Sequence, residues 1–207
     1  MQRFARVLMA SFIVLLLWSP NSFAVGVGTF VDASAGSGEA EWDSDYYSWD
    51  IDSNAAALGF VLDTAPTNES VFNYRLNIGF ARHELEDEYG DMTLKSNGVY
   101  AENIFGFAFV RNENFRWWAG PLIRVGYYTG DTGNSYRDID VDYAEFGMGG
   151  VTGLNFNVGG AILAPSVGFR FSGFAGEGEG TDLYGYSWKE DIEAFTSSVF
   201  ANFAVLF

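Results

Sequence analysis

The feature of this sequence that most restricts its fold is a two-residue alternation of apolar and polar side chains. From Phe72 to Phe80 every second residue is large and apolar, and the residues between them are polar or glycine. A second segment, from Ala161 to Ser172, repeats the pattern. Because successive side chains of a strand point to opposite faces, each segment predicts a strand with one apolar face.

The sequence also lacks long apolar runs after its first 24 residues. A helix that crosses a bilayer needs about 20 apolar residues, and no such run follows residue 24. In lipid, only helices and closed barrels pair all their backbone groups internally. We therefore predict an all-β fold, a closed antiparallel eight-stranded transmembrane β-barrel that forms one domain over residues 25–207. A soluble lipocalin-like barrel is the competing fold.

Eight candidate strands can be placed, an even number as in bacterial single-chain barrels. Their predicted ranges are 25–36, 54–63, 71–83, 97–110, 116–129, 143–156, 160–174 and 193–207. Short turns alternate with long loops in such barrels, and the long loops are expected at 37–53, 84–96, 130–142 and 175–192. Alternation continues through 136–143, so the sheet is expected to extend beyond the membrane.

The fourth candidate strand is irregular. Asn103 falls on the same face as Phe105, and Ile104 falls on the opposite one. We expect a bulge or a change of register at this point.

The segment 1–24 has the form of a secretory signal peptide. Arg3 and Arg6 precede an apolar run from Val7 to Trp18, and Ser22-Phe23-Ala24 supplies a small-residue cleavage pattern. Cleavage before Val25 is expected, with an uncleaved anchor as the alternative. Cysteine is absent, so neither a disulfide nor a lipid-modified thiol is available.

The net charge is strongly negative, with 27 acidic against 11 basic residues. Nucleic-acid binding is not expected, because it needs many Lys and Arg side chains. Most of the acids lie in the four predicted long loops, so one rim should carry nearly all the charge. This rim is either a solvated face or a binding site for Ca²⁺ or Mg²⁺, although no EF-hand pattern occurs. The candidate metal ligands are Asp43, Asp45, Asp50, Asp52, Asp138, Asp140 and Asp142.

Aromatic residues are interleaved with these acids. Rigid aromatic side chains suit the binding of an extracellular partner, and an aromatic girdle at the lipid interface is the alternative. The aromatic residues interleaved with the acids are Trp42, Tyr46, Tyr47, Trp49, Tyr89, Tyr136, Tyr184, Tyr186 and Trp188.

The polar faces of the strands point into the lumen in this fold. They carry three acids and three bases: Asp32, Arg75, Glu102, Arg124, Glu145 and Arg170. An eight-stranded barrel is only wide enough to be filled by side chains or to hold one small ligand. We expect these groups to form a paired polar plug, with a narrow ion or solute path as the alternative.

Enzymatic function has one candidate residue, His83, which is the only histidine. It is expected at the extracellular end of the third strand, beside Glu84, where lipid A deacylases and palmitoyltransferases place a histidine with a serine and an acid. No serine follows it in the deacylase pattern, so a surface histidine is the preferred interpretation. The glycine-rich stretch from Gly147 to Gly153 is not expected to bind phosphate, because no helix follows it as in phosphate-binding loops. No cofactor is expected.

Two segments resemble known outer-membrane proteins. The last strand places Val199, Ala201, Phe203, Val205 and Phe207 on one face and stops on an aromatic residue, which looks like their assembly signal. The resemblance implies recognition by the β-barrel assembly machinery. The segment from Trp117 to Tyr128 is similar to small barrels of the OmpX and opacity-protein type, although the acidic loops depart from that family.

The leading hypothesis is a non-enzymatic barrel in the bacterial outer membrane, embedded among lipid and lipopolysaccharide. Its acidic, aromatic rim would contact divalent cations or an extracellular ligand. Transport of small solutes is the second hypothesis, and modification of lipid A is the third.

Overall fold

The computed structural model describes residues 25–42, 48–66, 70–87, 93–112, 114–134, 137–181 and 187–207. These form eight strands: β1 (Gly26–Trp42), β2 (Trp49–Asp63), β3 (Phe72–Asp87), β4 (Thr93–Arg111), β5 (Phe115–Asn134), β6 (Arg137–Asn157), β7 (Ile162–Thr181) and β8 (Ser187–Leu206). The predicted signal peptide, 1–24, lies outside the described residues and stays a prediction.

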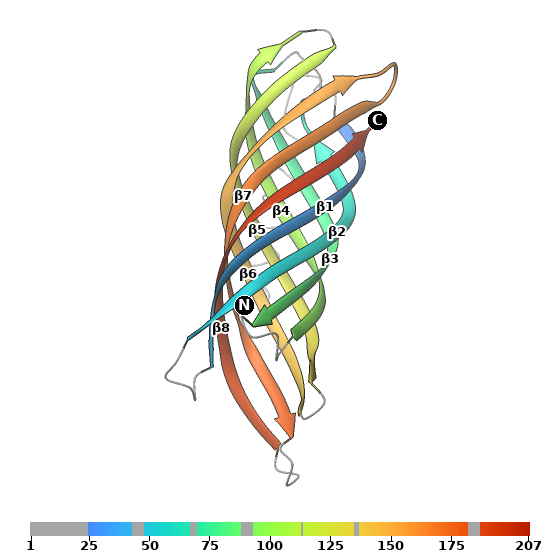
Figure 1. The fold of residues 1–207 in the computed structure, drawn as a ribbon. Coiled ribbons are helices and arrows are strands. Elements are labelled where there is room, and N and C mark those ends of the chain that lie inside the picture. The colour runs from blue at the N-terminus through green and yellow to red at the C-terminus, as the bar shows by residue number, and fades with distance from the viewer. Residues whose placement is uncertain are drawn as a thin grey trace, which may run out of the picture.

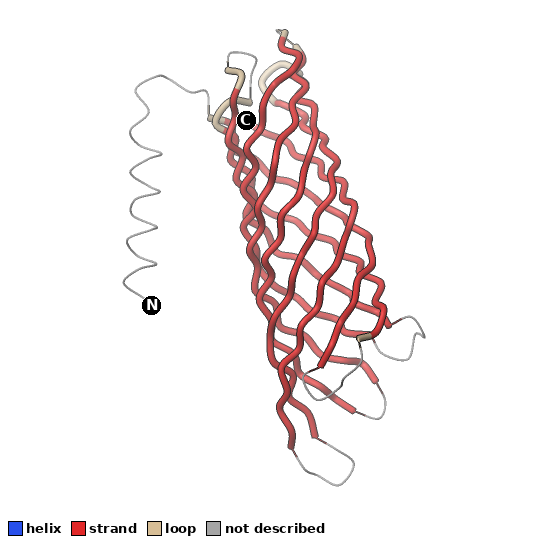
Figure 2. The backbone as a smooth tube through the Cα atoms, turned by 90° about the vertical axis from the view of Figure 1, so that its left-hand side faces the viewer, coloured by secondary structure: helices blue, strands red, loops and turns tan. Residues whose placement is uncertain are grey.

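The strands form one closed ring. Each strand pairs antiparallel with the next in the chain, and β1 pairs with β8 to close the barrel. Figures 1 and 2 show the tilted strands wrapping around a single axis. Among the described residues no helix is long and apolar enough to cross a membrane. The predicted fold class, an all-β closed barrel of eight antiparallel strands, is confirmed.

The two ends of the barrel differ, and we name them by their residues. At the Phe207 end, the backbone of Phe207 pairs with Val27. The opposite end is called the collar end, because outward-pointing acidic residues such as Glu41, Glu86 and Glu179 lie there. There the β7–β8 hairpin continues as far as the pair formed by Thr181 and Ser187 and projects beyond the other strands (Figure 1).

The prediction of four long loops at the collar end is wrong. Most of 37–53, 84–96, 130–142 and 175–192 is strand, so the connections are short at both ends. The physical reason lies inside the barrel, where apolar side chains pack together at this level and support a continued ladder. The inward-facing residues there are Ile51, Leu85, Leu94, Ile139 and Val141.

The irregularity predicted in the fourth strand exists but lies elsewhere. The register between β4 and β5 shifts between Ala108 and Val110, whereas Asn103 stays in register with Ile123. Asn103 points outward, and its Oδ1 accepts a hydrogen bond of 2.5 Å from the Tyr74 hydroxyl. Ile104 is buried in the lumen beside Trp118. A local hydrogen bond, not a bulge, therefore accommodates the polar residue.

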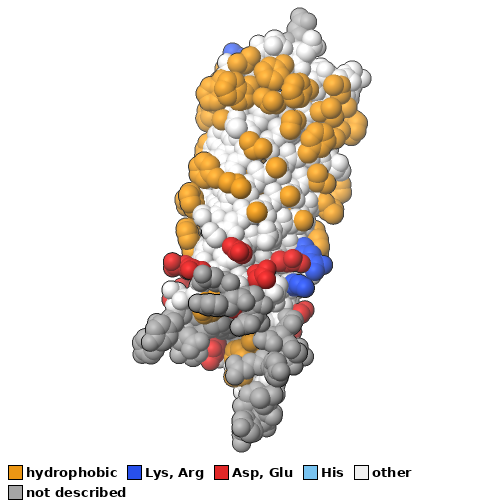
Figure 3. All heavy atoms as spheres, viewed as in Figure 1, with side chains coloured by type: hydrophobic (Ala, Val, Ile, Leu, Met, Phe, Trp, Pro, Cys, Tyr) orange, Lys and Arg blue, Asp and Glu red, His pale blue; other side chains and the backbone are white. Residues whose placement is uncertain are grey.

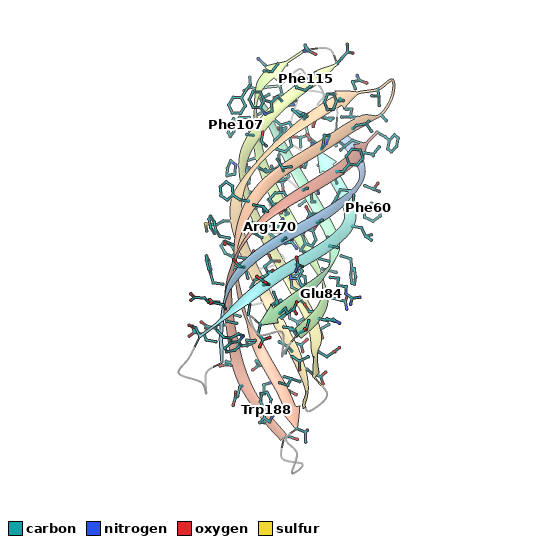
Figure 4. The ribbon with its side chains drawn as sticks, viewed as in Figure 1. Phe60, Glu84, Phe107, Phe115, Arg170 and Trp188 are labelled. Atoms are coloured by element: carbon teal, nitrogen blue, oxygen red, sulfur yellow. The ribbon has the colours of Figure 1, made fainter. Side chains whose placement is uncertain are left out.

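The outer wall carries a belt of exposed apolar side chains. Leu58 is 63% exposed and Phe60 is 70% exposed, and Figure 4 shows Phe60 and Phe107 pointing away from the barrel. On β7 the outward residues are apolar or glycine from Leu163 to Ala175, a rise of about 30 Å at about 3.3 Å per residue and a tilt of about 40°. This apolar belt matches the hydrocarbon thickness of a bilayer, about 30 Å.

Candidate functional site

A band of acidic residues lies next to the apolar belt. We call it the acidic collar; all its members point outward. They are Glu39, Glu41, Asp50, Asp52, Glu84, Glu86, Asp131, Asp140, Asp142, Glu177, Glu179, Asp191 and Glu193. Figure 3 shows acidic side chains gathered below the apolar surface on one face. The collar arises because the same alternation that places apolar residues outside on each strand continues with acids.

Strand register brings like charges together in the collar. Asp131 lies opposite Asp140, and Asp140 lies opposite Glu179 on its other side. Glu41 lies opposite Glu193. Like charges directly opposite each other across strands are destabilising, so the strand register leaves repulsion between neighbouring carboxylates in the collar.

Within the described part of the chain, the outward basic residues near the collar are Arg82, Lys95 and Lys189. Arg82 pairs with Glu84 at 3.2 Å. Lys189 pairs with Glu177 at 2.8 Å and with Glu179 at 3.0 Å, and these two carboxylates raise the pKa of its ammonium group. Basic partners thus neutralise a small part of the collar.

The candidate metal ligands are distributed around the barrel wall. Asp43 and Asp45, and the side chain of Asp138, lie outside the described residues. Asp50 and Asp52 project from β2, whereas Asp140 and Asp142 project from β6. No group of three or more possible metal ligands occurs among the side chains that the structure describes.

Of the aromatic residues assigned to the rim, two have described side chains. Trp49 and Trp188 pack against the hydrophobic cluster inside the barrel, and Figure 4 places Trp188 on the projecting β7–β8 hairpin. These two side chains lie on the lumenal face of their strands and so do not form a girdle at the lipid interface. Their part in binding a partner stays a prediction. The side chains of Trp42, Tyr46, Tyr47, Tyr89, Tyr136, Tyr184 and Tyr186 lie outside the described residues.

The structure places all six predicted lumenal charges inside the barrel, buried. Arg170 Nη2 lies 2.9 Å from Glu102 Oε2, and Asn77 donates to the other oxygen of Glu102 at 3.2 Å. Asp32 accepts a hydrogen bond from Asn202 Nδ2 at 3.4 Å. These residues form the central layer of a polar plug.

A second layer lies toward the collar end. Arg124 Nε is 2.9 Å from Glu145 Oε2, which also accepts a hydrogen bond from the Tyr128 hydroxyl at 2.7 Å. Ser172 Oγ donates to the remaining oxygen of Glu145 at 2.8 Å. The Arg124 guanidinium stacks 3.5 Å over the Tyr100 ring. Glu145 is therefore the shared acceptor of three side chains from two strands, β5 and β7.

A third layer, toward the Phe207 end, was missed by the sequence analysis. Arg75 pairs with Asp63 at 2.8 Å instead of with one of the six predicted residues. Asn155 Oδ1 accepts hydrogen bonds from Arg75 and from Trp118 Nε1. Arg116 donates to Asn73 at 3.1 Å. The available signal was parity, because Asp63 and Arg116 share the inward face of Val61 and Trp118.

His83 does not lie on the surface, so the preferred interpretation of it is wrong. Its side chain points into the lumen and is 4% exposed. The imidazole stacks on the Tyr128 ring at 4.3 Å and meets Phe174 edge-on at 6.1 Å. Neither ring nitrogen has a hydrogen-bond partner among the described residues. The ring is thus enclosed by aromatic side chains, away from any lipid.

Apolar side chains pack among the polar layers in the described part of the lumen. A cluster of Ile104, Trp118, Leu122, Val151 and Phe200 packs inside the barrel, and a larger apolar cluster extends from Leu206 near the Phe207 end to Ile139 at the collar end. The inner ion pairs are buried within this packing. This arrangement explains why an eight-stranded barrel is a filled structure.

The residues of the predicted assembly signal share the outer face of β8. Val199 is 67% exposed, and Phe203 is 42% exposed. Ala201 and Val205 occupy the intervening outward positions. Recognition of this face and of Phe207 by an assembly machinery stays a prediction.

The sequence matches no protein-family model, and no curated protein matches it. Among solved structures, it is similar to Neisserial surface protein A at 14% identity over 83% of this chain and 95% of that chain, with a TM-score of 0.35. The translocator domain of the autotransporter NalP from Neisseria meningitidis is 10% identical over 100% of this chain and 96% of its own, with a TM-score of 0.42.

The outer membrane protease OmpT from Escherichia coli is 8% identical over 91% of this chain and 99% of that chain, with a TM-score of 0.45. The protease activity is a property of OmpT. The ring of eight antiparallel strands, apolar outside and polar within, identifies the architecture as that of a small bacterial outer-membrane β-barrel.

Proposed function

We propose that this protein is a non-enzymatic barrel of the bacterial outer membrane that uses its acidic collar to bind cations at the membrane surface. The observation that carries the proposal is the position of the collar directly beyond the apolar belt, where the head groups of the surrounding lipid would lie. Water would disfavour so large an exposed apolar surface, and a bilayer would accept it.

The cations that fit the collar best are divalent. Carboxylate oxygens are ligands for Ca²⁺ and Mg²⁺, and a divalent ion can join a carboxylate to a lipid phosphate. The partner surface is therefore lipopolysaccharide, whose phosphates would be repelled by the collar without a bridging ion. This role contributes to envelope integrity through lateral contacts between protein and lipid.

The interior supports a scaffold over a transporter. Each polar layer contains one buried ion pair, and apolar side chains pack among the layers. His83, the single catalytic candidate, is enclosed by aromatic rings. Neither feature favours the second and third hypotheses.

The test measures lipopolysaccharide binding by the purified protein in phosphatidylcholine vesicles. Binding to vesicles that contain lipopolysaccharide is compared with and without millimolar Ca²⁺, and again after chelation. We expect Ca²⁺ to strengthen the association and chelation to reverse it. A variant with Asp131→Asn, Asp140→Asn, Asp142→Asn and Glu177→Gln should lose most of this response.

The matched control replaces four uncharged residues on the outer wall, next to the collar carboxylates, with other uncharged residues: Ser37→Asn, Asn54→Gln, Asn97→Gln and Thr129→Asn. It keeps the charge and should respond as the wild type does. Heat-modifiable migration on gels verifies folding of both variants. Equal binding with and without Ca²⁺ would refute the proposal.

A further inference from the structure

The outer wall contains a hollow where a side chain is missing. Gly173 points outward from β7, with Phe146 of β6 opposite it on one side and Phe195 of β8 on the other. A Cβ atom added at Gly173 would meet no atom nearer than the Phe146 carbonyl oxygen, at 4.0 Å. The glycine thus leaves unfilled space between two aromatic side chains.

The space has the size and lining of a site for an acyl chain. Its volume is about 890 Å³. The small residues Ala144 and Ala175 adjoin Gly173, and the larger walls are Phe146, Met148, Phe171 and Phe195. The rings of Phe171 and Phe195 are nearly parallel, at 9°, with centroids 6.4 Å apart. We call this space the Gly173 hollow.

One side of the Gly173 hollow reaches the acidic collar. Glu39, Glu41 and Glu193 also line it, and Glu41 lies directly opposite Glu193. In the described part of the chain no ion pair involves these three carboxylates. An apolar space therefore adjoins negative charge that has no counter-ion among the described residues.

A smaller groove continues from the same place. Its volume is about 610 Å³, and it shares Glu39 and Phe195 with the Gly173 hollow. Its other lining includes Ser37, Asp50 and Asp52. The two adjoining spaces together offer apolar and acidic lining, as an amphiphile has an apolar and a charged part.

We infer that the Gly173 hollow binds an amphiphile with one acyl chain and an ammonium head group. The chain would lie between Phe146 and Phe195, and the ammonium group would meet Glu41 and Glu193. Charge complementarity selects this head group, because an anion would add to the existing repulsion and an uncharged group would leave it unrelieved. The inference rests on the proposed function for the position of the collar at a membrane surface.

The test follows amide NMR shifts of Ala144 and Ala175 in dodecyl maltoside micelles at neutral pH. The probes are protonated dodecylamine, dodecanol and dodecanoate. We expect dodecylamine to bind with saturable shifts, dodecanol to bind about tenfold more weakly, and dodecanoate to bind more weakly still. Equal affinity for dodecylamine and dodecanol would overturn the inference.

Two variants separate the chain site from the head-group site. Gly173→Leu fills the hollow and should weaken dodecylamine about tenfold, since it displaces roughly two methylene groups of the ligand. Glu41→Gln with Glu193→Gln should weaken dodecylamine about fivefold and leave dodecanol unchanged.

Matched controls test whether the effect is local. Ala56→Leu adds the same type of side chain to the outer wall of β2, and Asp131→Asn with Asp140→Asn removes an equal charge from another part of the collar. Both should bind dodecylamine as the wild type does. An equal loss in the two charge variants would overturn the inference in favour of general attraction by the collar.

The two proposals can fail independently. Absence of a Ca²⁺ response from the wild-type protein in lipopolysaccharide vesicles refutes the collar function and leaves the dodecylamine titration unaffected. Binding of dodecylamine that is insensitive to Gly173→Leu refutes the Gly173 hollow as a site, while the Ca²⁺ response persists. Heat-modifiable migration shows that each variant has folded before it is titrated.

Discussion

The inner and outer walls are built from the same eight strands, yet opposite charges are paired on the inner wall and like charges are neighbours on the outer wall. Inside, arginines and carboxylates alternate in pairs, such as Arg124 with Glu145 and Arg170 with Glu102, and each partner is buried. Outside, carboxylates face one another, as Asp131 does Asp140. The inner charges are balanced, and the outer ones are nearly all of one sign.

Solvation explains the difference. A buried ion loses several kcal/mol of hydration, so it persists only with a partner and further hydrogen bonds. An exposed carboxylate remains hydrated, and a like-charged neighbour costs only a few tenths of a kcal/mol to about 1 kcal/mol. Folding therefore dictates the inner charges, whereas the outer collar is tolerated by the fold and available for function.

The largest effect is expected from breaking an inner pair. Glu145→Ala removes the acceptor of Arg124, Tyr128 and Ser172 and leaves a buried cation without its partner. The free energy of unfolding should fall by about 3–5 kcal/mol. Urea unfolding in lipid vesicles, followed by heat-modifiable migration, measures it.

Glu145→Gln is the control, because its amide keeps one acceptor oxygen and the side-chain volume. It should cost less than Glu145→Ala. A loss below about 1 kcal/mol in the alanine variant would contradict the view that the inner charges are structural.

The next effect comes from placing a charge on the apolar belt. Leu58→Lys exposes an ammonium group to lipid near the middle of β2, where the wild-type side chain is 63% exposed. A lysine at the bilayer midplane costs about 2–4 kcal/mol, measured by the same unfolding assay in vesicles. Ser37→Lys, beside the collar, should be nearly neutral. Equal losses of stability at the two positions would contradict the assignment of the apolar belt as the part of the barrel that lies in the membrane.

The periodicity of the sequence was sufficient to predict the barrel and the direction of every inner charge that it named. Arg75 and Leu76 are neighbours in the sequence, and they point to opposite faces of the barrel wall as a two-residue period predicts. Pairing was not predictable, because Arg75 meets Asp63 across neighbouring strands only once register is known. Register depends on the whole ring, and no local sequence pattern specifies it.

The collar was also only partly predictable. Its acids were placed correctly at one end, but they were assigned to loops because acidic residues are poor strand formers. Inward residues such as Ile139 and Leu94 overrode that preference by packing inside the barrel. The Gly173 hollow could not be predicted, since it depends on Phe146 and Phe195 from two other strands meeting one glycine.

A smaller effect is expected from His83, a buried residue whose two ring nitrogens have no hydrogen-bond partner among the described residues. His83→Phe keeps a ring against Tyr128 and removes two nitrogen atoms that have no partner in the described structure. Replacing an unpaired buried polar group with an apolar one should raise the free energy of unfolding by about 1 kcal/mol. His83→Ala should instead lower it, because the lost ring leaves a cavity.

Equal destabilisation by His83→Phe and His83→Ala, measured by urea unfolding, would show that the imidazole nitrogens have a polar partner. The histidine would then belong with the paired inner charges.

The smallest effect is expected in the collar itself. Asp131→Asn with Asp140→Asn relieves a like-charge contact across β5 and β6 and should raise the free energy of unfolding by about 0.5 kcal/mol at low ionic strength. The gain should disappear in about 1 M salt, where the screening length falls to about 3 Å. Urea unfolding at the two salt concentrations measures both values. A loss of stability at low salt would mean that these carboxylates have structural partners, and the contrast between the two walls would no longer hold at this position.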